Sequence, residues 1–248
     1  MAHLAAAYLK SCWSNPLSVN GIAGFTLTAS QAAAARSALL DDARGSIYSG
    51  LVSYAEAVHG LDKGLFAWST VKLYYACFYL AQSFLNRSGK CVFYIGRSPI
   101  FIECVAGATP LRKQGNSHSI VRNVYQDIFH NGALAAQPIG GVPAIEWMAQ
   151  QREQTNYRDL RFSDPSAPAW FHSVEKWGLR RLLATYVHDP VTYQYDEDHA
   201  MLALPTAAFL ESASSSLGFS GLGLNAQDLA FIRGRLRDSS GPISLQFL

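Results

Sequence analysis

Apolar positions recur every three or four residues over most of the chain, which is the spacing of one face of an α-helix. The first long stretch covers residues 31–58 behind Ser30, a residue type that caps helix starts. Gly45 and Gly50 interrupt it and predict a bend or a break. A second helix is expected over about residues 63–87, almost wholly buried because nearly every position is apolar or aromatic. These two expected helices together predict an αα-hairpin, the unit from which helical bundles are commonly built.

Two short runs of β-favouring residues follow, over residues 91–95 and 100–105, and a turn containing Gly and Pro joins them. This pattern predicts a β-hairpin near 91–105 that is inserted among helices. The polar residues 109–117 after it are expected to form a loop. The predicted fold class is therefore mainly α, a helical bundle with a small inserted β-hairpin.

Helical periodicity resumes in the second half of the chain. The expected helices cover residues 117–130, 144–157, 169–187, 198–217 and 226–237. Pro205 is expected to kink the fourth of these helices. The Ser- and Gly-rich residues 212–223 are the predicted linker. We expect the bundle to occupy residues 1–190 and a C-terminal helical extension to occupy residues 191–248.

Composition narrows the class of protein. Charged residues make up only 15% of the chain and apolar residues 49%, so helices must be buried on several faces or packed against a partner. A formal net charge of +2 is too small for a general DNA coat, so any nucleic-acid contact must come from a local cluster. No apolar run approaches the roughly 18 residues of a membrane span, and the apolar start lacks the basic region of a signal peptide.

Four cysteines occur without a CxxC pair, and they predict reduced thiols in a cytoplasmic protein. No His or Cys pair has zinc-ligand spacing, and no sequence motif of a nucleotide, hydrolase or metalloprotease site is present. We expect no cofactor and no metal. The acidic residues from Asp196 to His199 offer a weak divalent-cation alternative, but acidic runs at helix starts usually serve the helix dipole.

Lys72 lies on the aromatic face of the second predicted helix, together with Trp68, Tyr75 and Tyr79. An unpaired buried ammonium costs several kcal/mol, so the lysine needs a partner. One reading pairs it with a carboxylate on the neighbouring helix, for which the sequence offers Asp41, Asp42 and Glu56. The other reading makes it a nucleic-acid-binding residue that faces a phosphate groove.

A second polar cluster ends the helix predicted over residues 144–157. Arg152 and Asn156 share a helical face, and Arg158 follows. Arginine and asparagine side chains at a helix end can grip phosphate or carboxylate, or they can hold the following loop through its backbone. Arg152 is a candidate catalytic residue here, and Asn156 and Arg158 are candidate nucleic-acid-binding residues.

A third cluster opens the helix predicted at residue 117. His118 stands at the helix N-terminus, close to Lys113, and Arg122 and Asn123 follow one turn later. The helix N-terminus favours anions, so a histidine there is placed beside an anion site. His118 and Arg122 are therefore candidate catalytic residues, and the alternative is that His118 is a surface capping residue.

The aromatic pattern from Trp68 to Tyr79 on the second helix of a hairpin resembles the HEPN superfamily, over about residues 30–190. These helical bundles occur in prokaryotic toxins, in abortive-infection and CRISPR-linked proteins, and in partners of minimal nucleotidyltransferases. Catalytic members cut RNA without a metal, using an Arg and a His that four to six residues separate, and they often dimerise. Two segments here have that spacing, Arg112 to His118 and Arg181 to His188.

The resemblance implies a protein that acts on RNA or on a nucleic-acid complex in prokaryotic defence or toxin–antitoxin function. It further implies metal-independent endoribonuclease chemistry and a homodimer or a protein partner. The alternative is a non-catalytic interaction subunit of a multi-protein defence complex, in which the low surface charge and the aromatic excess serve a protein interface.

Overall fold

The structure is a computed structural model that describes residues 3–13, 20–215 and 218–236. It is mainly α-helical, with ten α-helices and two small antiparallel sheets among these residues, which confirms the predicted fold class. Contacts divide the chain into two compact units, residues 1–46 with 81–128 and residues 47–80 with 129–248. The predicted division at residue 190 stays a prediction.

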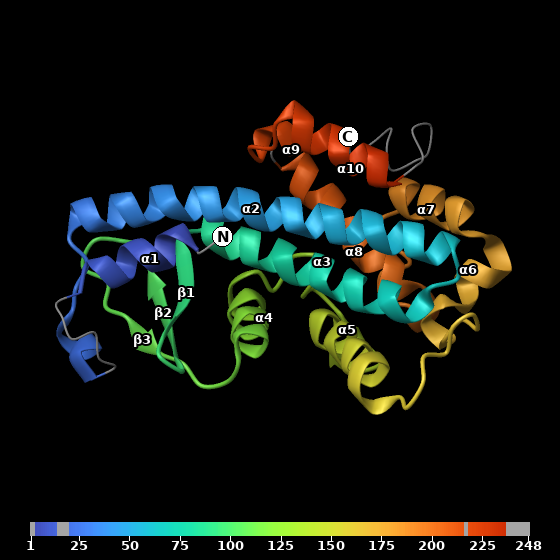
Figure 1. Ribbon diagram of the computed structural model, residues 1–248, viewed down its shortest axis with the longest axis horizontal. Coiled ribbons are helices and arrows are strands. Elements are labelled where there is room, and N and C mark those ends of the chain that lie inside the picture. Colours follow the sequence, from blue (N-terminus) through green and yellow to red (C-terminus); the bar gives the residue numbers. More distant parts are fainter. Residues whose placement is uncertain (1–2, 14–19, 216–217, 237–248) are drawn as a thin grey trace. The chain divides into compact units, whose positions relative to one another are not determined.

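Two long helices, α2 (Ala29–Asp62) and α3 (Phe66–Arg87), form the predicted αα-hairpin and contribute to both units (Figure 1). The prediction of a break in α2 is wrong, because the helix is continuous. At Gly50 a Cβ atom would lie 3.2 Å from the Ala76 carbonyl oxygen and 3.3 Å from the Phe209 ring. The glycine therefore allows a close approach of neighbouring elements instead of ending the helix.

The first unit also contains a three-stranded antiparallel sheet. Its other elements are α1 (Leu4–Ser11), η1 (Asn20–Gly24), β1 (Lys90–Ile95), β2 (Ser98–Glu103), β3 (Leu111–Arg112) and α4 (Ser117–Ile128). Strand β1 pairs with β2 as the predicted hairpin, with Phe93 opposite Ile100. Strand β3 was not predicted, since only two residues of the expected polar loop pair with β2. The alternation along β1 buries Cys91, Phe93 and Ile95 in the core of this unit.

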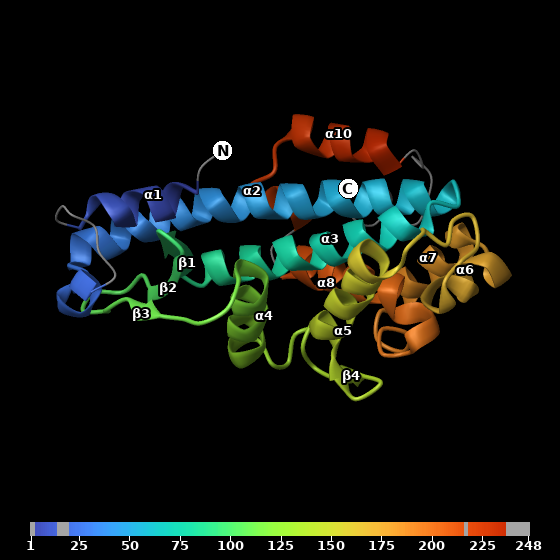
Figure 2. The same ribbon diagram turned by 60° about the horizontal axis from the view of Figure 1, so that its bottom comes forward.

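The second unit is almost entirely helical (Figure 2). Its elements after α3 are β4 (Pro138–Ile139), β5 (Val142–Pro143), α5 (Ala144–Glu153), the π-helix η2 (Gln154–Arg158), η3 (Ala169–Phe171), α6 (His172–Trp177), α7 (Leu179–His188), α8 (Glu197–Ser214), α9 (Gly218–Gly221) and α10 (Ala226–Leu236). Residues 200–209 of α8 are all buried and form the centre of this unit. There the Tyr54 and Thr206 hydroxyls are hydrogen-bonded at 2.6 Å, and the Tyr54 and Phe209 rings lie 5.5 Å apart.

Two predicted boundaries in this unit are wrong. The single helix expected over residues 169–187 is split at Gly178, whose φ of +79° does not fit a right-handed helix. The linker expected over residues 212–223 is partly helical, because residues 212–214 end α8 and residues 218–221 form α9. Pro205 lies inside α8, and the kink expected there stays a prediction. Residues 216 and 217 of the expected linker lie outside the described residues.

Candidate nucleic-acid interface

Helix α3 is as deeply buried as its sequence predicts. Of its residues, only Trp68 near the start and Arg87 at the end are exposed. Its small polar side chains are used internally: the Ser69 hydroxyl donates to the Ala57 carbonyl at 3.0 Å, and the Trp170 Nε1–H donates to the Thr70 hydroxyl at 3.0 Å. The helix can therefore supply functional side chains only at these two exposed positions and where a half-buried position reaches the surface.

Lys72 is one such half-buried position. Its Nζ lies 3.3 Å from the Glu56 carboxylate on α2, one of the three partners that the sequence offered. Glu56 also accepts a second cation, since Arg235 of α10 lies 3.3 Å from its other oxygen. The three side chains keep between 31% and 50% of their surface exposed, so solvent screening weakens both pairs. Nucleic-acid binding by Lys72 stays a prediction.

We expect Lys72→Met to weaken RNA binding less than about threefold, because this ammonium is already paired with Glu56. The free energy of unfolding should fall by no more than about 1 kcal/mol, the upper range for a solvent-screened pair. Fluorescence anisotropy with a labelled RNA and urea unfolding measure the two effects. Glu56→Gln is the matched control. A tenfold loss of RNA affinity in Lys72→Met alone would instead make Lys72 a direct contact.

Arg152 occupies the centre of a tyrosine cluster. We use this name for Arg152 with Tyr74 and Tyr75 of α3 and Tyr157 of η2. The guanidinium carbon lies 5.6, 5.5 and 5.1 Å from the ring centres of Tyr74, Tyr75 and Tyr157. Its Nη2 donates to the Tyr75 hydroxyl at 3.1 Å and is 3.4 Å from the Tyr157 hydroxyl. A cation over the electron-rich faces of phenol rings is attracted to each of them.

Electrostatics keep Arg152 charged in this setting. Desolvation by burial lowers the pKa of Arg152, but the hydrogen bond to Tyr75 and the interactions with the three tyrosines outweigh it, and the pKa is raised. Within residues 3–13, 20–215 and 218–236, no carboxylate forms an ion pair with this guanidinium. Its positive charge is therefore balanced only by aromatic rings and hydroxyls, which leaves it able to attract an anion.

The π-helix explains how Tyr157 reaches Arg152. The sequence predicts a regular helix to residue 157, with Glu153 placed beside Tyr157. Instead the chain widens at Gln154, and the Asp159 N–H donates to the Gln154 carbonyl at 3.0 Å, five residues back. Single π-turns inside helices are frequent at functional sites. The wider turn brings Tyr157 to Arg152 and leaves the Tyr157 side chain exposed, at 68%.

The two other predicted residues of this segment lie on the same π-turn. Asn156 is half-buried and Arg158 is exposed. The neighbouring loop is held by α3, because the Asp164 carboxylate accepts the Ala67 N–H at 3.0 Å and the Phe162 ring contacts Trp68 at 5.7 Å. The second unit thus places the exposed ring of Tyr157 beside Arg152, with Asn156 and Arg158 next to Tyr157 in the chain, and α3 holds the loop that follows. An exposed ring beside a held cation is a platform on which a base can stack.

His118 and Arg122 belong to the first unit, and both lie on α4. Asn116 caps this helix, since its side-chain oxygen accepts the Ser119 N–H at 2.9 Å, so His118 stands in the first turn as predicted. His118 is half-buried and Arg122 is only 8% exposed. Arg122, a candidate catalytic residue from the sequence, is therefore almost fully buried. The sequence also predicts that one basic polar cluster joins the six candidate residues, and that stays a prediction; they are Lys72, His118, Arg122, Arg152, Asn156 and Arg158.

The two Arg–His segments differ in their setting. Arg112 is in β3 and His118 is on α4, so that segment crosses a loop. Arg181 and His188 are both exposed on α7, while Leu182, Leu183 and Tyr186 between them are buried. Seven positions equal nearly two helical turns, which puts the arginine and the histidine on one face, about 10 Å apart along the axis. The sequence showed this spacing but not the exposure.

Other kinds of site find no support in the described part of the chain. It contains no group of three or more His, Cys, Asp and Glu side chains that could hold a metal. Asp196 caps α8, because its side chain accepts the Asp198 N–H at 3.0 Å, which agrees with the expectation that this acidic run serves the start of a helix. None of the described helices combines the length and the hydropathy that crossing a bilayer requires. The four cysteines are free.

Comparisons of the chain with protein families, with curated proteins and with solved structures find no match.

Proposed function

We propose that this chain is a HEPN-like helical protein that acts on RNA, or on a nucleic-acid complex, in prokaryotic defence or toxin–antitoxin function. One observation carries the proposal: Arg152 holds a positive charge without a described carboxylate partner, directly beside the exposed ring of Tyr157. Proteins bind single-stranded nucleic acid with cations that contact the phosphates and with neighbouring aromatic rings on which the bases stack. The buried aromatic helix of the αα-hairpin supports the HEPN part of the proposal.

The proposed reaction is metal-independent cleavage of the RNA backbone. A histidine removes the proton of a ribose 2′-hydroxyl, whose oxygen then bonds to the adjacent phosphorus as the bond to the 5′-oxygen breaks. A proton is returned to the leaving oxygen, and an arginine stabilises the negative charge on the phosphate. His118 with Arg122, both on α4, is the first candidate set. His188 with Arg181 is the second set, since both are exposed on one face of α7.

Cleavage of a labelled RNA by the purified protein in EDTA tests this proposal. We expect wild-type cleavage, and we expect it to fall at least about a hundredfold in His118→Ala or in His188→Ala, as the loss of a general base and acid requires. His172→Ala removes an exposed histidine of α6 and serves as the matched control. Equal cleavage in all three variants would exclude His118 and His188 as catalytic residues. Absence of cleavage together with RNA binding would leave a binding protein, and absence of both would overturn the proposal.

A second candidate is a non-catalytic interaction subunit. A group of exposed apolar side chains in the second unit favours it: Leu65, Trp68, Leu160, Phe162 and Trp177 are between 40% and 107% exposed. Large exposed apolar groups of this kind are typical of protein interfaces. A chain that binds no RNA, yet sediments as a dimer that Trp68→Ser disrupts, would support this candidate over the first.

A further inference from the structure

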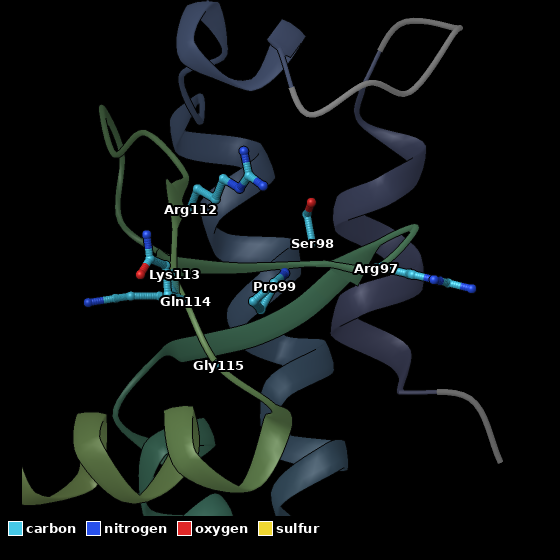
Figure 3. A pocket seen from close by; sticks show the side chains of 7 residues that line it. All are labelled: Arg97, Ser98, Pro99, Arg112, Lys113, Gln114 and Gly115. Carbon is cyan, nitrogen blue, oxygen red and sulfur yellow. The ribbon is translucent and has the colours of Figure 1, made fainter.

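A hollow of about 450 Å³ lies in the first unit, beside the turn between β1 and β2. It is lined by Arg97, Ser98, Pro99, Arg112, Lys113, Gln114 and Gly115 (Figure 3). The turn supplies one wall, and β3 with the segment after it supplies the other. The two walls meet because Ile100 of β2 pairs with Arg112 of β3. Of the residues that the sequence analysis names for catalysis, only Arg112 of the Arg112–His118 spacing lines this hollow.

Three of the lining side chains are cations, and none is an acid. Arg97 and Arg112 are exposed, and Lys113 is half-buried with its Nζ 5.3 Å from the centre of the Phe101 ring. In the part of the chain that the structure describes, none of the three forms an ion pair. The local charge of +3 exceeds the net charge of +2 of the whole chain. Like charges gathered on one surface repel each other, and a bound anion removes that repulsion.

The directions of these side chains indicate the kind of anion. Figure 3 shows Arg112 and Ser98 pointing to one side, Lys113 and Gln114 to another, and Arg97 away from the rest. They do not converge on one point, as the ligands of a single phosphate would. Cations spread around an open hollow instead match several negative charges along an extended chain.

The backbone of the hollow is fixed before any ligand arrives. The Lys113 N–H donates to the Pro99 carbonyl at 2.9 Å, which continues the β2–β3 pairing by one residue. Gly115 has a φ of +111°, and a Cβ atom there would lie 2.6 Å from the Ser119 hydroxyl oxygen. A glycine is therefore favoured at this bend, both by its φ and by the nearness of the start of α4. Only the long side chains need to adjust to a ligand.

We infer that this hollow binds the phosphate groups of an RNA strand, through Arg97, Arg112 and Lys113. The inference rests on the proposed function and adds to it a second RNA contact, on the first unit. Contacts of this type position the strand and carry no base sequence information. Binding at the hollow should therefore depend on salt and be nearly the same for RNAs of different sequence.

Anisotropy titrations of a labelled single-stranded RNA at several salt concentrations test the inference. The hollow variant carries Arg97→Gln, Arg112→Gln and Lys113→Gln. Each lost phosphate contact lowers the slope of log affinity against log salt by about 0.7, so we expect a slope smaller by about 2 and an affinity at least tenfold lower. The control variant carries Arg87→Gln, Lys176→Gln and Arg233→Gln, three exposed cations elsewhere, and it loses the same net charge.

The outcomes separate this inference from the proposed function. If the wild type binds RNA and the hollow and control variants have equal slopes of log affinity against log salt, the hollow does not bind RNA. The proposed function would still stand. Absence of wild-type RNA binding would overturn the proposed function itself. If inorganic phosphate displaces RNA at concentrations similar to those of competing RNA, the hollow is a site for small anions and not for an extended RNA strand. Circular dichroism spectra of the two variants confirm that both are folded.

Discussion

Arg152→Ala is expected to weaken the binding of single-stranded RNA by about ten- to a hundredfold. The substitution removes a charge that the described residues leave without a carboxylate partner, and hydrogen bonds to charged groups contribute about 1.5–3 kcal/mol. It also frees Tyr157, because the guanidinium lies 5.1 Å from that ring and holds it in place. A freed ring loses part of the stacking energy of about 1–3 kcal/mol per base. Anisotropy titrations at fixed salt measure the loss.

Three further variants separate the charge of Arg152 from the tyrosine ring. Arg152→Lys keeps the charge without the planar guanidinium, and we expect it to restore only part of the affinity. Tyr157→Phe keeps the ring and should bind RNA within about threefold of wild type, whereas Tyr157→Ala should approach Arg152→Ala. Arg44→Ala is the control, since Arg44 is exposed and paired with Asp41 at 2.7 Å. Wild-type affinity in Arg152→Ala, with urea unfolding showing a folded chain, would remove the tyrosine cluster from the RNA site.

The hairpin of α2 and α3 could be predicted because its signal is long and periodic. Almost every position of the second helix is apolar or aromatic, and the helix is indeed buried or half-buried except at Trp68 and Arg87. The same argument identified Glu56 as one of three acids that could pair with Lys72. A buried helix constrains its few charged residues strongly, so their partners can be sought on the neighbouring helix.

The features that the sequence did not predict depend on contacts between distant segments. Gly50 lies in an uninterrupted helix because Phe209, far along the chain, needs the space that a side chain would fill. Strand β3 is two residues long, too short for any periodic pattern, and it exists only because β2 offers a free edge. Propensity describes one segment at a time, and tertiary packing overrides it at these places.

In the candidate sites, too, the sequence shows which residue types are present but not which side chains the fold brings together. The sequence picked out Arg152 and the basic segment around Lys113, since arginine and lysine in polar stretches are visible directly. The sequence predicts Tyr157 beside Glu153. No sequence pattern indicates the π-turn that brings the tyrosine to Arg152. Arg97 was missed, because only the β2–β3 pairing brings the turn between β1 and β2 next to Arg112 and Lys113.

The stability of this protein is expected to collapse in alkaline solution, with a steep loss beginning near pH 9. Burial raises the pKa of the Cys77 and Cys91 thiols far above their usual range and that of Cys104 to about 11. Burial also raises the pKa of the Tyr54 and Tyr186 phenols far above theirs. In the unfolded chain, thiols lose their protons near pH ~8.5 and phenols near pH ~10.

The sign of the effect follows from which state holds the protons. These groups stay neutral in the folded protein at a pH where the unfolded chain has already released their protons. Their contribution to stability is complete below the unfolded pKa values and is lost as the pH rises above them. Each retained proton lowers the free energy of unfolding by about 1.4 kcal/mol per pH unit. Three thiols alone give about 4 kcal/mol per unit above pH ~9, against a typical total stability of about 5–15 kcal/mol.

Urea unfolding in a reducing buffer at pH 7, 9, 10 and 10.5 measures this slope, and the midpoint should fall sharply at each step above pH 9. Cys77→Ala removes one titrating group and should reduce the slope by about 1.4 kcal/mol per pH unit. Val71→Ala is the matched control, because it also shortens a buried side chain of α3 but removes no proton, so it should lower stability equally at every pH. A midpoint that stays constant between pH 7 and 10.5 would mean that water reaches these thiols, and the buried core described for both units would then be wrong.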